Sequence, residues 1–429
     1  MHDLLPKEVI ESLCQESKYD FRNRLLTPAV TVFHMLNAAI SPEKSFQSAW
    51  HNIGEIGGSD VLSKARKRLP LEVWEMLHGY TAKQIDKEFS EEGRWRGHRV
   101  VGVDGSCVSM SDEEELTKAF GKSGSKGSLS RFPVGRVVFG FLLNLMTVVG
   151  HRVGAYRISE NALFSELTED LQSSDLIIGD RQFAGAKRYV EYKRAGLEFI
   201  TRAHQRDSLK VVEVLGKDDF IVQLPIPKVY LRKDPGLPAS IRVRMIKGRA
   251  KVRGRKTTIW LATSLLEARK YPAGEIKLLY KKRWKVEGLI GEIKIWLGAD
   301  ILRSKSEEGI RKELYARLIA FNLTHWLILR SCKKHNKSPE ATQRISVSAT
   351  LRLTAAYSLK MGAADDKGVV PLYEELLDKI SRCNVAYRGG RIEPRMKKRD
   401  QKHYPILKIS RAEWRSINEK VYNITKVPA

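Results

Sequence analysis

Cysteine is scarce in this sequence and forms no pattern that would organise a metal centre or a disulfide framework. The chain of 429 residues contains four cysteines, and their spacing matches neither kind of site. They are Cys14, Cys107, Cys332 and Cys383. No cluster of histidine and cysteine competes as a zinc or iron site. This use of cysteine is typical of a reducing compartment, so we expect a cytoplasmic protein.

Long hydrophobic runs are also missing. The longest apolar run, Val137–Val149, is interrupted by Gly140 and Asn144 and is too short for a transmembrane helix. It predicts one or two buried strands instead. Asp3 and Glu8 interrupt any hydrophobic core of a signal peptide at the start of the chain. We therefore expect no membrane partner.

Acidic residues are outnumbered by basic ones along the whole chain. The sequence has 76 Lys and Arg against 50 Asp and Glu, which gives a formal net charge of +26. Together with a pI of about 9.8, this excess is typical of a protein that binds nucleic acid. The segment Phe120–Ser128 is rich in glycine, serine and lysine, but it lacks the spacing of a nucleotide-binding P-loop. We expect a mobile loop there.

One segment, Tyr280–Lys294, places a carboxylate between an aromatic hydroxyl and two cations. Steps of three, four and seven residues lead from Tyr280 to Arg283, Glu287 and Lys294. On one continuous helix, residues seven apart return to nearly the same face, so these side chains would line one stripe. A carboxylate flanked by cations suits a metal-bound phosphate.

Apolar residues recur at three- and four-residue steps in the same segment, which predicts an amphipathic helix packed on a core. They are Ile276, Leu279, Val286, Ile290, Ile293 and Leu297. The polar stripe would then face a cleft. The alternative is an ordinary solvated face of lysine and glutamate, which is common in basic proteins.

Two aspartates are candidate partners for Glu287. Asp104 lies within an apolar, β-branched run that predicts a buried strand; the alternative is a turn formed by Asp104 and Gly105. Asp180 follows a short apolar strand and precedes a helical pattern, where α/β folds often bind ligands. The alternative for Asp180 is a helix N-cap. Together, Asp104, Asp180 and Glu287 form the carboxylate set of a two-metal phosphoryl-transfer site.

The segments around these residues resemble the DDE transposases of insertion-sequence family four, which share a Y-R-E-K signature. The resemblance includes Asp104-Gly-Ser, Asp180-Arg and the signature formed by Tyr280, Arg283, Glu287 and Lys294. Ser63–Pro70 is similar to the N-terminal helical segment of that family, and Arg303–Glu313 to its C-terminal part. The likeness therefore spans most of the chain.

The resemblance implies a bacterial enzyme that moves an insertion sequence by cutting and pasting DNA. Asp104, Asp180 and Glu287 match the catalytic triad, which would hold two Mg²⁺ ions, with Mn²⁺ tolerated. Tyr280, Arg283 and Lys294 match residues that contact DNA at the transposon end. The expected partners are the inverted-repeat ends, the target DNA and a second copy of the chain in the end complex. Two alternatives are a non-catalytic, transposase-derived DNA-binding protein and a structure-specific nuclease.

The order of strand and helix patterns predicts an α/β fold with an RNase H-like core. Strands are expected at 99–110, 134–148, 152–157, 175–179 and 197–202, and helices at 159–172 and 183–195. A β-rich insertion is expected at about 205–265. We expect three domains: a helical DNA-binding domain at 1–95, the catalytic core with its insertion at 96–330, and a helical region with a basic tail at 331–429.

Further residues are candidates for DNA contact. Trp260 lies on a predicted strand just before the signature, and in hairpin-forming members of the resembling family such a tryptophan stacks on a flipped-out base. The alternative is a tryptophan of the core. Arg181 follows the second aspartate, and a basic helix after Ser59 carries Lys64 and Arg66. The basic run Arg388–Arg399 predicts an arm along phosphates or a disordered tail.

Overall fold

The computed structural model describes residues 5–22, 26–41, 43–45, 47, 60–125, 128–203, 210–252, 255–385, 413, 414, 416 and 417. The basic run Arg388–Arg399 lies outside the described residues. Within the described part of the chain, no helix is long and apolar enough to span a membrane. All four cysteines are free thiols.

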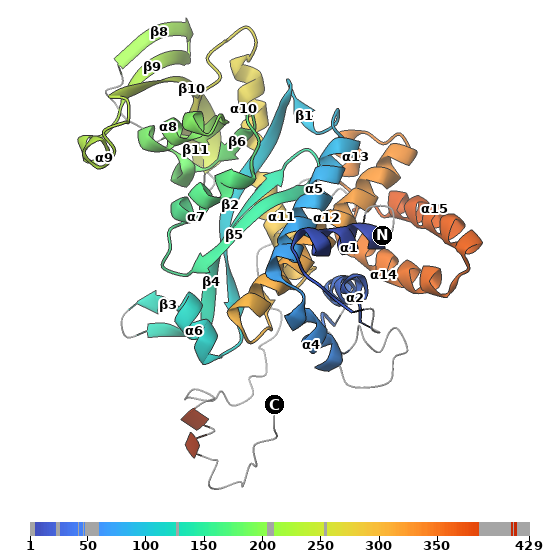
Figure 1. Cartoon of the computed structure of the whole chain (residues 1–429). Helices are drawn as coiled ribbons and strands as arrows, with labels where there is room; N and C mark the ends of the chain where they lie inside the picture. Colours follow the sequence, from blue (N-terminus) through green and yellow to red (C-terminus); the bar gives the residue numbers. More distant parts are fainter. Residues whose placement is uncertain are drawn as a thin grey trace.

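Five strands form the centre of the fold (Figure 1). They are β2 (His98–Met110), β4 (Ser128–Leu142), β5 (Thr147–Ala155), β6 (Leu176–Gly179) and β7 (Glu198–Arg202). Their order across the sheet is β5-β4-β2-β6-β7. The strands β2, β4 and β5 are antiparallel neighbours, whereas β6 and β7 run parallel to β2. Three antiparallel strands followed by two parallel ones confirm the predicted RNase H-like core.

Four further strands continue this sheet beyond β7, where the sequence predicts a β-rich insertion. They are β8 (Lys210–Gly216), β9 (Asp219–Pro225), β10 (Ser240–Val252) and β11 (Arg255–Thr263), with the short helix α9 (Lys228–Lys233) between β9 and β10. Because β11 pairs with β7, the insertion joins the core sheet directly. Figure 1 shows β8, β9 and α9 at the end of the molecule furthest from the C-terminal helices.

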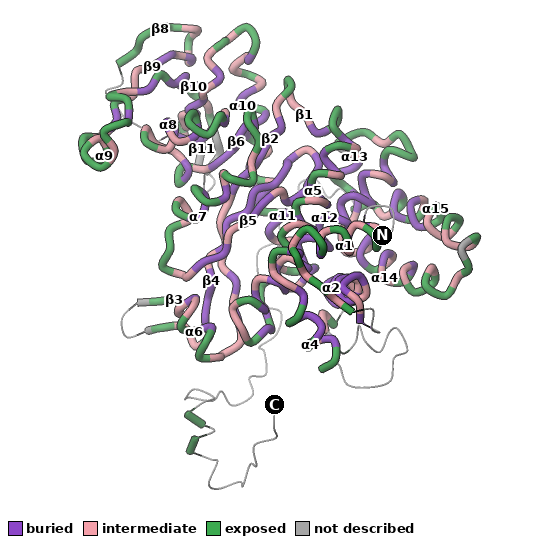
Figure 2. Tube along the Cα trace, viewed as in Figure 1, coloured by how far each residue is buried: buried purple, intermediate pink, exposed green. Residues whose placement is uncertain are grey.

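Helices from both ends of the chain cover one side of the sheet. They are α1 (Lys7–Glu16), α2 (Pro28–Ile40), α4 (Asp60–Arg68), α5 (Leu71–Glu88), α12 (Glu307–Lys334), α13 (Pro339–Thr342), α14 (Val347–Ala363) and α15 (Asp366–Arg382). Thr27 caps α2 with its side chain, and Pro28 takes the first helical position, where its missing N–H costs no hydrogen bond. The long helix α12 contacts α2, α5, α14 and α15. Its buried residues lie at the centre of this helical layer (Figure 2).

The remaining elements are β1 (Arg94–Trp95), α6 (Glu114–Phe120), β3 (Lys122–Ser125), α7 (Glu160–Leu167), η1 (Thr168–Asp170), η2 (Arg181–Phe183), α8 (Ala186–Arg194), α10 (Ala273–Lys281), α11 (Trp284–Ile295) and β12 (Ile301–Leu302). The helix α7 packs on the face of β4 and β5 opposite to α5 and α12. Gly154 of β5 faces Leu163 of α7, whereas His151, three residues away, packs against Tyr315 of α12. Residues an odd number of positions apart point to opposite faces of a strand.

A buried asparagine of α12 pairs with the edge strand β5. The side chain of Asn322 donates a hydrogen bond to the carbonyl oxygen of Val148 (2.9 Å) and accepts one from its N–H (2.8 Å). These two bonds satisfy backbone groups that an edge strand would otherwise leave unpaired.

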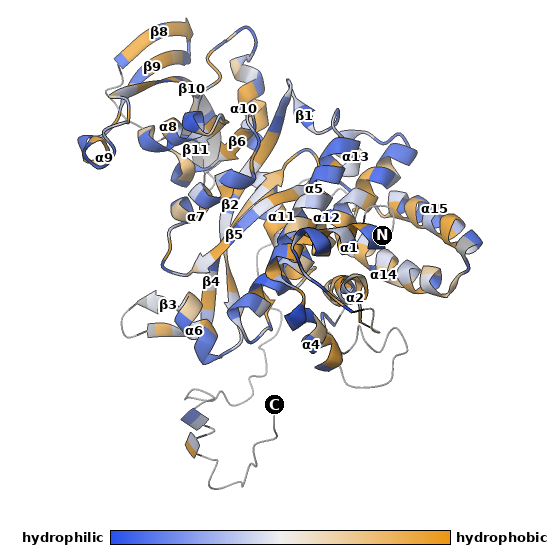
Figure 3. Ribbon diagram, viewed as in Figure 1, coloured by the Kyte–Doolittle hydropathy of each residue, from blue (hydrophilic) through white to orange (hydrophobic). Residues whose placement is uncertain are grey.

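Hydrophobic residues concentrate in the central strands and in the helices that cover them (Figure 3).

Some predicted boundaries are wrong. The expected strand 134–148 is two strands, because the chain reverses between Leu142 and Thr147, with Met146 at a positive φ of 52°. The segment 120–128, predicted as a mobile loop, contains β3, which pairs with the start of β4. The expected helix 159–172 ends at Leu167 and continues as the 3-10 turn η1. The three-domain division remains a prediction.

Candidate active site

Asp104 lies in the middle of the central strand β2. It pairs with Phe139 of β4, and β2 continues for six more residues to Met110, so the alternative of a turn at Asp104 and Gly105 is wrong. Its Oδ1 accepts a hydrogen bond of 2.8 Å from the N–H of Gly105. Burial raises the pKa of Asp104 to about 6; the hydrogen bond from Gly105 lowers the pKa, and the negative charge of Asp180 adds to the rise. The strand thus holds a half-buried carboxylate next to a second one.

Asp180 lies beside Asp104 because of the strand register. The parallel strands β2 and β6 pair Gly102 with Ile178, so two residues further each strand reaches its aspartate. Asp180 Oδ1 also accepts a hydrogen bond of 2.7 Å from the N–H of Gln182. Through this bond Asp180 caps η2. Asp180 therefore directly follows β6 and caps a helical turn, as the N-cap alternative predicts, and its role in binding a ligand remains a prediction.

The signature segment is two helices, and the prediction of one continuous helix is wrong. The helix α10 ends at Lys281 and α11 begins at Trp284. Between them the N–H of Arg283 bonds to the carbonyl oxygen of Tyr280 at 3.0 Å, a three-residue step that tightens the turn. No glycine or proline stands at this junction, so the sequence carries no signal for the break. The predicted apolar stripe is nevertheless buried.

Arg283 lies between Asp104 and Glu287. Its guanidinium donates a hydrogen bond of 3.1 Å to Oε1 of Glu287, and a second nitrogen lies 3.8 Å from Oδ2 of Asp104. The arginine side chain is buried and stacks on Trp284, with 4.3 Å between the guanidinium carbon and the ring centre. A positive group thus links Glu287 to Asp104. Among the described residues, no three His, Cys, Asp or Glu side chains form a ready-made metal site.

Lys294 and Tyr280, the outer residues of the signature, both contact protein groups. The ammonium group of Lys294 donates to the carbonyl oxygen of Cys107 at 2.9 Å and to Oγ of Ser106 at 3.3 Å. Tyr280 is buried, and burial raises its pKa to about 12. Both Arg283 and Asp180 influence that pKa, so Tyr280 belongs to the same cluster. The predicted DNA contacts of Tyr280 and Lys294 remain predictions.

The other candidate DNA-binding residues lie on elements outside the signature helices. Trp260 is half-buried on β11, with its ring 6.2 Å from that of Phe220 and the ammonium of Lys247 5.9 Å above it. Arg181 is exposed on η2. Arg66 of the basic helix α4 does not face solvent, because it is buried and donates to Oγ of Ser304 at 2.9 Å. The expectation that Arg66 faces DNA is therefore wrong.

The structure adds a residue that the sequence analysis missed. Glu160, the first residue of α7, packs against Gly105: a Cβ built on that glycine would lie 2.3 Å from Cδ of Glu160. Arg136 of β4 donates to Oε1 of Glu160 at 3.3 Å. Burial raises the pKa of Glu160, the charge of Arg136 opposes the rise, and Asp180 adds to it. The only sequence signal was Ser159, whose side chain caps a helix directly after the third core strand.

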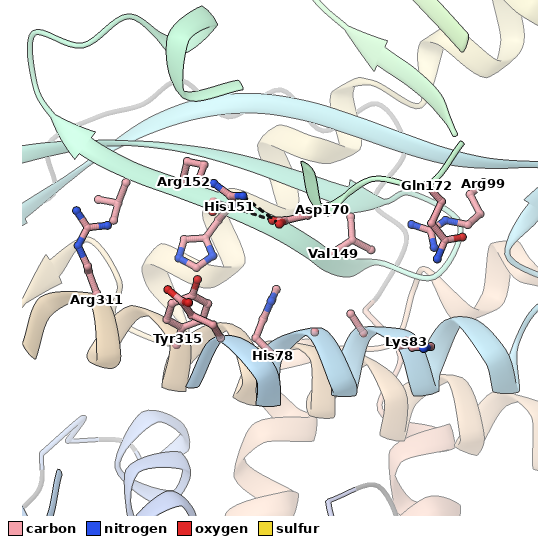
Figure 4. A pocket seen from close by; sticks show the side chains of 14 residues that line it. His78, Lys83, Arg99, Val149, His151, Arg152, Asp170, Gln172, Arg311 and Tyr315 are labelled. Carbon is pink, nitrogen blue, oxygen red and sulfur yellow. Dashed lines mark hydrogen bonds and ion pairs between the residues drawn. The ribbon is translucent and has the colours of Figure 1, made fainter. Parts of the chain in front are cut away.

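A separate cavity of about 550 Å³ lies at the edge strand β5, between α5 and α12 (Figure 4). His78, His151 and Tyr315 pack against one another in its wall. Burial lowers the pKa of His78 to about 4 and holds that of His151 well below its usual value. The cavity contains none of the predicted site residues.

Comparisons with known proteins address the region that holds the carboxylates. Residues 95–323 match the family described as transposase DDE domain. The chain is 25% identical over 346 residues to the transposase InsG for insertion sequence element IS4 of Escherichia coli K12, covering 80% of this chain and 77% of that protein. It is 25% identical over 275 residues to a putative transposase of Sinorhizobium fredii, covering 62% of this chain and 70% of that protein.

A solved structure also resembles this one at low similarity. The piggyBac transposase in a synaptic complex with hairpin DNA matches with a TM-score of 0.42 and 11% sequence identity, over 91% of this chain and 86% of that one.

Proposed function

Since this chain belongs to the family of DDE transposases, we propose that it excises an insertion sequence by cutting DNA at the inverted-repeat ends and joins the freed ends to target DNA. The family match covers the three predicted carboxylates and the whole signature. The predicted resemblance to insertion-sequence family four is confirmed, and the chain is a phosphoryl-transfer enzyme that cleaves DNA. The cut-and-paste route, the ends that it binds and the metal it uses belong to our proposal.

The observation that carries the proposal is the placement of Asp180 beside Asp104, with Glu287 linked to them through Arg283. All three are oxygen donors, which Mg²⁺ prefers, and Arg283 already holds a positive charge between two of them. In this proposal Asp104, Asp180 and Glu287 hold two Mg²⁺ ions, or Mn²⁺ in their place. When bound, such ions stabilise the charge that develops on the attacking and leaving oxygens.

The chain's own cations then position the DNA. Arg283 exchanges the carboxylate of Glu287 for a phosphate oxygen at the cleaved end, and Tyr280 orients that phosphate from its buried position. Lys294 fixes β2 through Ser106 and Cys107 and presents its charge to the next phosphate. Arg181 contacts the backbone from η2, and Trp260 stacks on a displaced base.

The remaining assignments are also part of the proposal. The N-terminal helical region reads the inverted repeat, the core with its insertion cleaves, and the C-terminal helical region supports both. Two copies of the chain hold the two ends in one complex, because both ends must be cut together. The protein works in the cytoplasm of a bacterium. A net charge of +26 supports the DNA partner.

Cleavage of DNA carrying the element's own ends tests the function. We expect Asp104→Asn, Asp180→Asn and Glu287→Gln to lower Mg²⁺-dependent cleavage by orders of magnitude while end binding in EDTA persists. Glu169→Gln is the control, since this exposed carboxylate lies outside the cluster. Absence of cleavage by the unaltered chain would favour the DNA-binding alternative, and cleavage without strand transfer would favour a nuclease.

A further inference from the structure

A smaller cavity, of about 260 Å³, lies between α2 and α12. Its wall on the side of α2 is apolar. Among the described residues that line it, Lys44, Arg303 and Arg317 are cations and Glu313 is the one carboxylate. With all four ionised, their charges sum to 3 − 1 = +2. This volume is below that of ordinary small-molecule pockets, so the cavity suits a small anionic group better than a whole nucleotide.

The carboxylate of Glu313 is already occupied by protein donors. It accepts hydrogen bonds from the N–H groups of Arg303 and Ser304, from the Ser304 hydroxyl at 2.6 Å and from the guanidinium of Arg317 at 2.5 Å. These bonds use the acceptor sites of a carboxylate, and its charge offsets that of Arg317. Neither Lys44 nor the side chain of Arg303 forms an ion pair with any described residue. Two positive charges of the cavity are therefore left without a bonded anionic partner.

Lys44 and Arg317 converge on the backbone just after α11. Arg317 is only 4% exposed and donates a hydrogen bond to the carbonyl oxygen of Gly298. The side chain of Lys44 packs on the same residue, since a Cβ at Gly298 would lie 3.3 Å from Cγ of Lys44. Burial and then the charge of Arg317 lower the pKa of Lys44 to about 8, and the charge of Glu43 offsets only part of this fall.

Arg303 adds to this crowding of like charges. Burial lowers the pKa of Arg317, and the charge of Arg303 adds to the fall. The carboxylates of Glu313 and Asp300 oppose it, and the effect of Arg303 is larger than that of Asp300. The fold thus holds three cations together although they repel one another. Such an arrangement is costly in the free protein and favours the binding of an anion.

We propose that this cavity binds a phosphate group of the DNA backbone, with Lys44 and Arg303 as its direct contacts and Arg317 as a buried positive charge behind them. The inference rests on the proposed function and adds a phosphate contact outside the signature. Gly298 lies four residues after Lys294, so the cavity is next to the end of α11 that carries Lys294 and extends the proposed path of the DNA.

The salt dependence of DNA binding tests the inference. Lys44→Met and Arg303→Met keep an apolar stem and remove the charge. The full-length variants are titrated in EDTA, at a series of salt concentrations, with duplex DNA that carries the element's end. We expect each variant to flatten the slope of log K against log salt concentration by about one unit. Lys333→Met is the control, because this cation pairs with Glu92 at the other end of α12, and its slope should match that of the unaltered chain.

Thermal melting separates a phosphate site from a structural role. Without DNA and phosphate, Lys44→Met should melt at or above the temperature of the unaltered chain, because the substitution removes repulsion from Arg317. A lower melting temperature together with an unchanged salt slope would overturn the inference and make Lys44 a structural residue. Inorganic phosphate is the probe for a free anion. If it stabilises the unaltered chain but not Lys44→Met, while both bind DNA with the same slope, the cavity serves free phosphate and the DNA contact is wrong.

Cleavage distinguishes this inference from the proposed function. If the unaltered chain binds and cleaves the element's ends while Lys44→Met and Arg303→Met retain its salt slope, the proposed function stands and the inference is wrong. If the unaltered chain neither binds nor cleaves these ends, both are wrong.

Discussion

The guanidinium of Arg283 donates a hydrogen bond of 3.1 Å to Glu287, one helical turn further along the chain. This bond gives a proposed metal ligand a protein cation as its partner. In the proposed function, Glu287 exchanges this partner for a metal and Arg283 then becomes available to a DNA phosphate. The proposal therefore couples metal binding and DNA binding through one arginine.

Replacement of Arg283 should weaken DNA binding and change its dependence on salt. A lost phosphate contact flattens the slope of log K against log salt concentration by about one unit. We expect this for Arg283→Ala in binding titrations between low and moderate salt. Lys379→Ala on α15 is the control, because it removes a cation of the C-terminal helices that pairs with Glu375. An unchanged slope together with a lowered melting temperature would make Arg283 a structural residue.

Lys294 should contribute to stability as well as to DNA binding. Its ammonium group donates to Cys107 and Ser106 and so ties α11 to β2. Charged hydrogen bonds are worth about 1.5–3 kcal/mol, so we expect Lys294→Met, which keeps the hydrophobic stem, to lower the free energy of unfolding by about that amount. Urea unfolding measures it. Unaltered stability would mean that these contacts have no net value and that Lys294 serves DNA alone.

Trp260 offers a way to separate two steps of the reaction. If the half-buried ring stacks on a displaced base, Trp260→Ala should leave the first nick nearly intact and impair the later strand-transfer or hairpin step. If the ring only packs against Phe220 and its neighbours, the variant should lose up to about 3–5 kcal/mol of stability and fail at every step. Nicking and the later step are measured separately, beside a thermal melt. A stable variant with both steps at full rate would contradict both accounts.

Asn322 should be among the most sensitive residues of α12. Its replacement by leucine leaves the N–H and carbonyl of Val148 without their partners inside the protein. At about 1–3 kcal/mol for each unsatisfied group, we expect a loss of about 2–6 kcal/mol in the free energy of unfolding. Thr324→Val on the same helix should cost less, since the Thr324 hydroxyl bonds only within its own turn. Equal losses would show that the pairing with β5 adds nothing.

Acid should destabilise the protein through the histidines of the cavity in Figure 4. Burial lowers the pKa of His78 from 6.5 to about 4, so between these values the unfolded chain binds a proton that the folded chain does not. The stability that neutral His78 provides is therefore complete above pH 6.5 and is lost progressively as the pH falls toward 4. The loss approaches roughly 3 kcal/mol. Burial also lowers the pKa of His151, so this histidine too makes the folded chain less stable in acid.

Urea unfolding at a series of pH values checks this dependence. His78→Leu should reduce the loss of stability between pH 6.5 and 4, while the part due to His151 remains. The same pH dependence in the variant would assign the effect to other groups.

The sequence predicted those parts of the site that depend on local patterns. β-branched runs located the strands of Asp104 and Asp180, and the apolar stripe located the buried side of the signature. The break before Trp284 was not predictable, since the junction contains no helix-breaking residue. Glu160 was missed because its position near Asp104 depends on the approach of α7 to Gly105, a tertiary contact with no spacing signal. The burial of Arg66 likewise depends on a tertiary contact, with Ser304, which lies far away in the sequence.

The packing of α12 against α2 and α5 has a consequence for the order of folding. The N-terminal helices leave the ribosome more than 200 residues before the helix that covers them, because α5 ends at Glu88 and α12 begins at Glu307. Until then their apolar faces lack their native cover and are open to aggregation and proteolysis. A chain interrupted before Glu307 would therefore be degraded and not persist as a free N-terminal fragment. Under the proposed function, which assigns the reading of the inverted repeat to the N-terminal helices, such a fragment would otherwise occupy the DNA ends without cutting them.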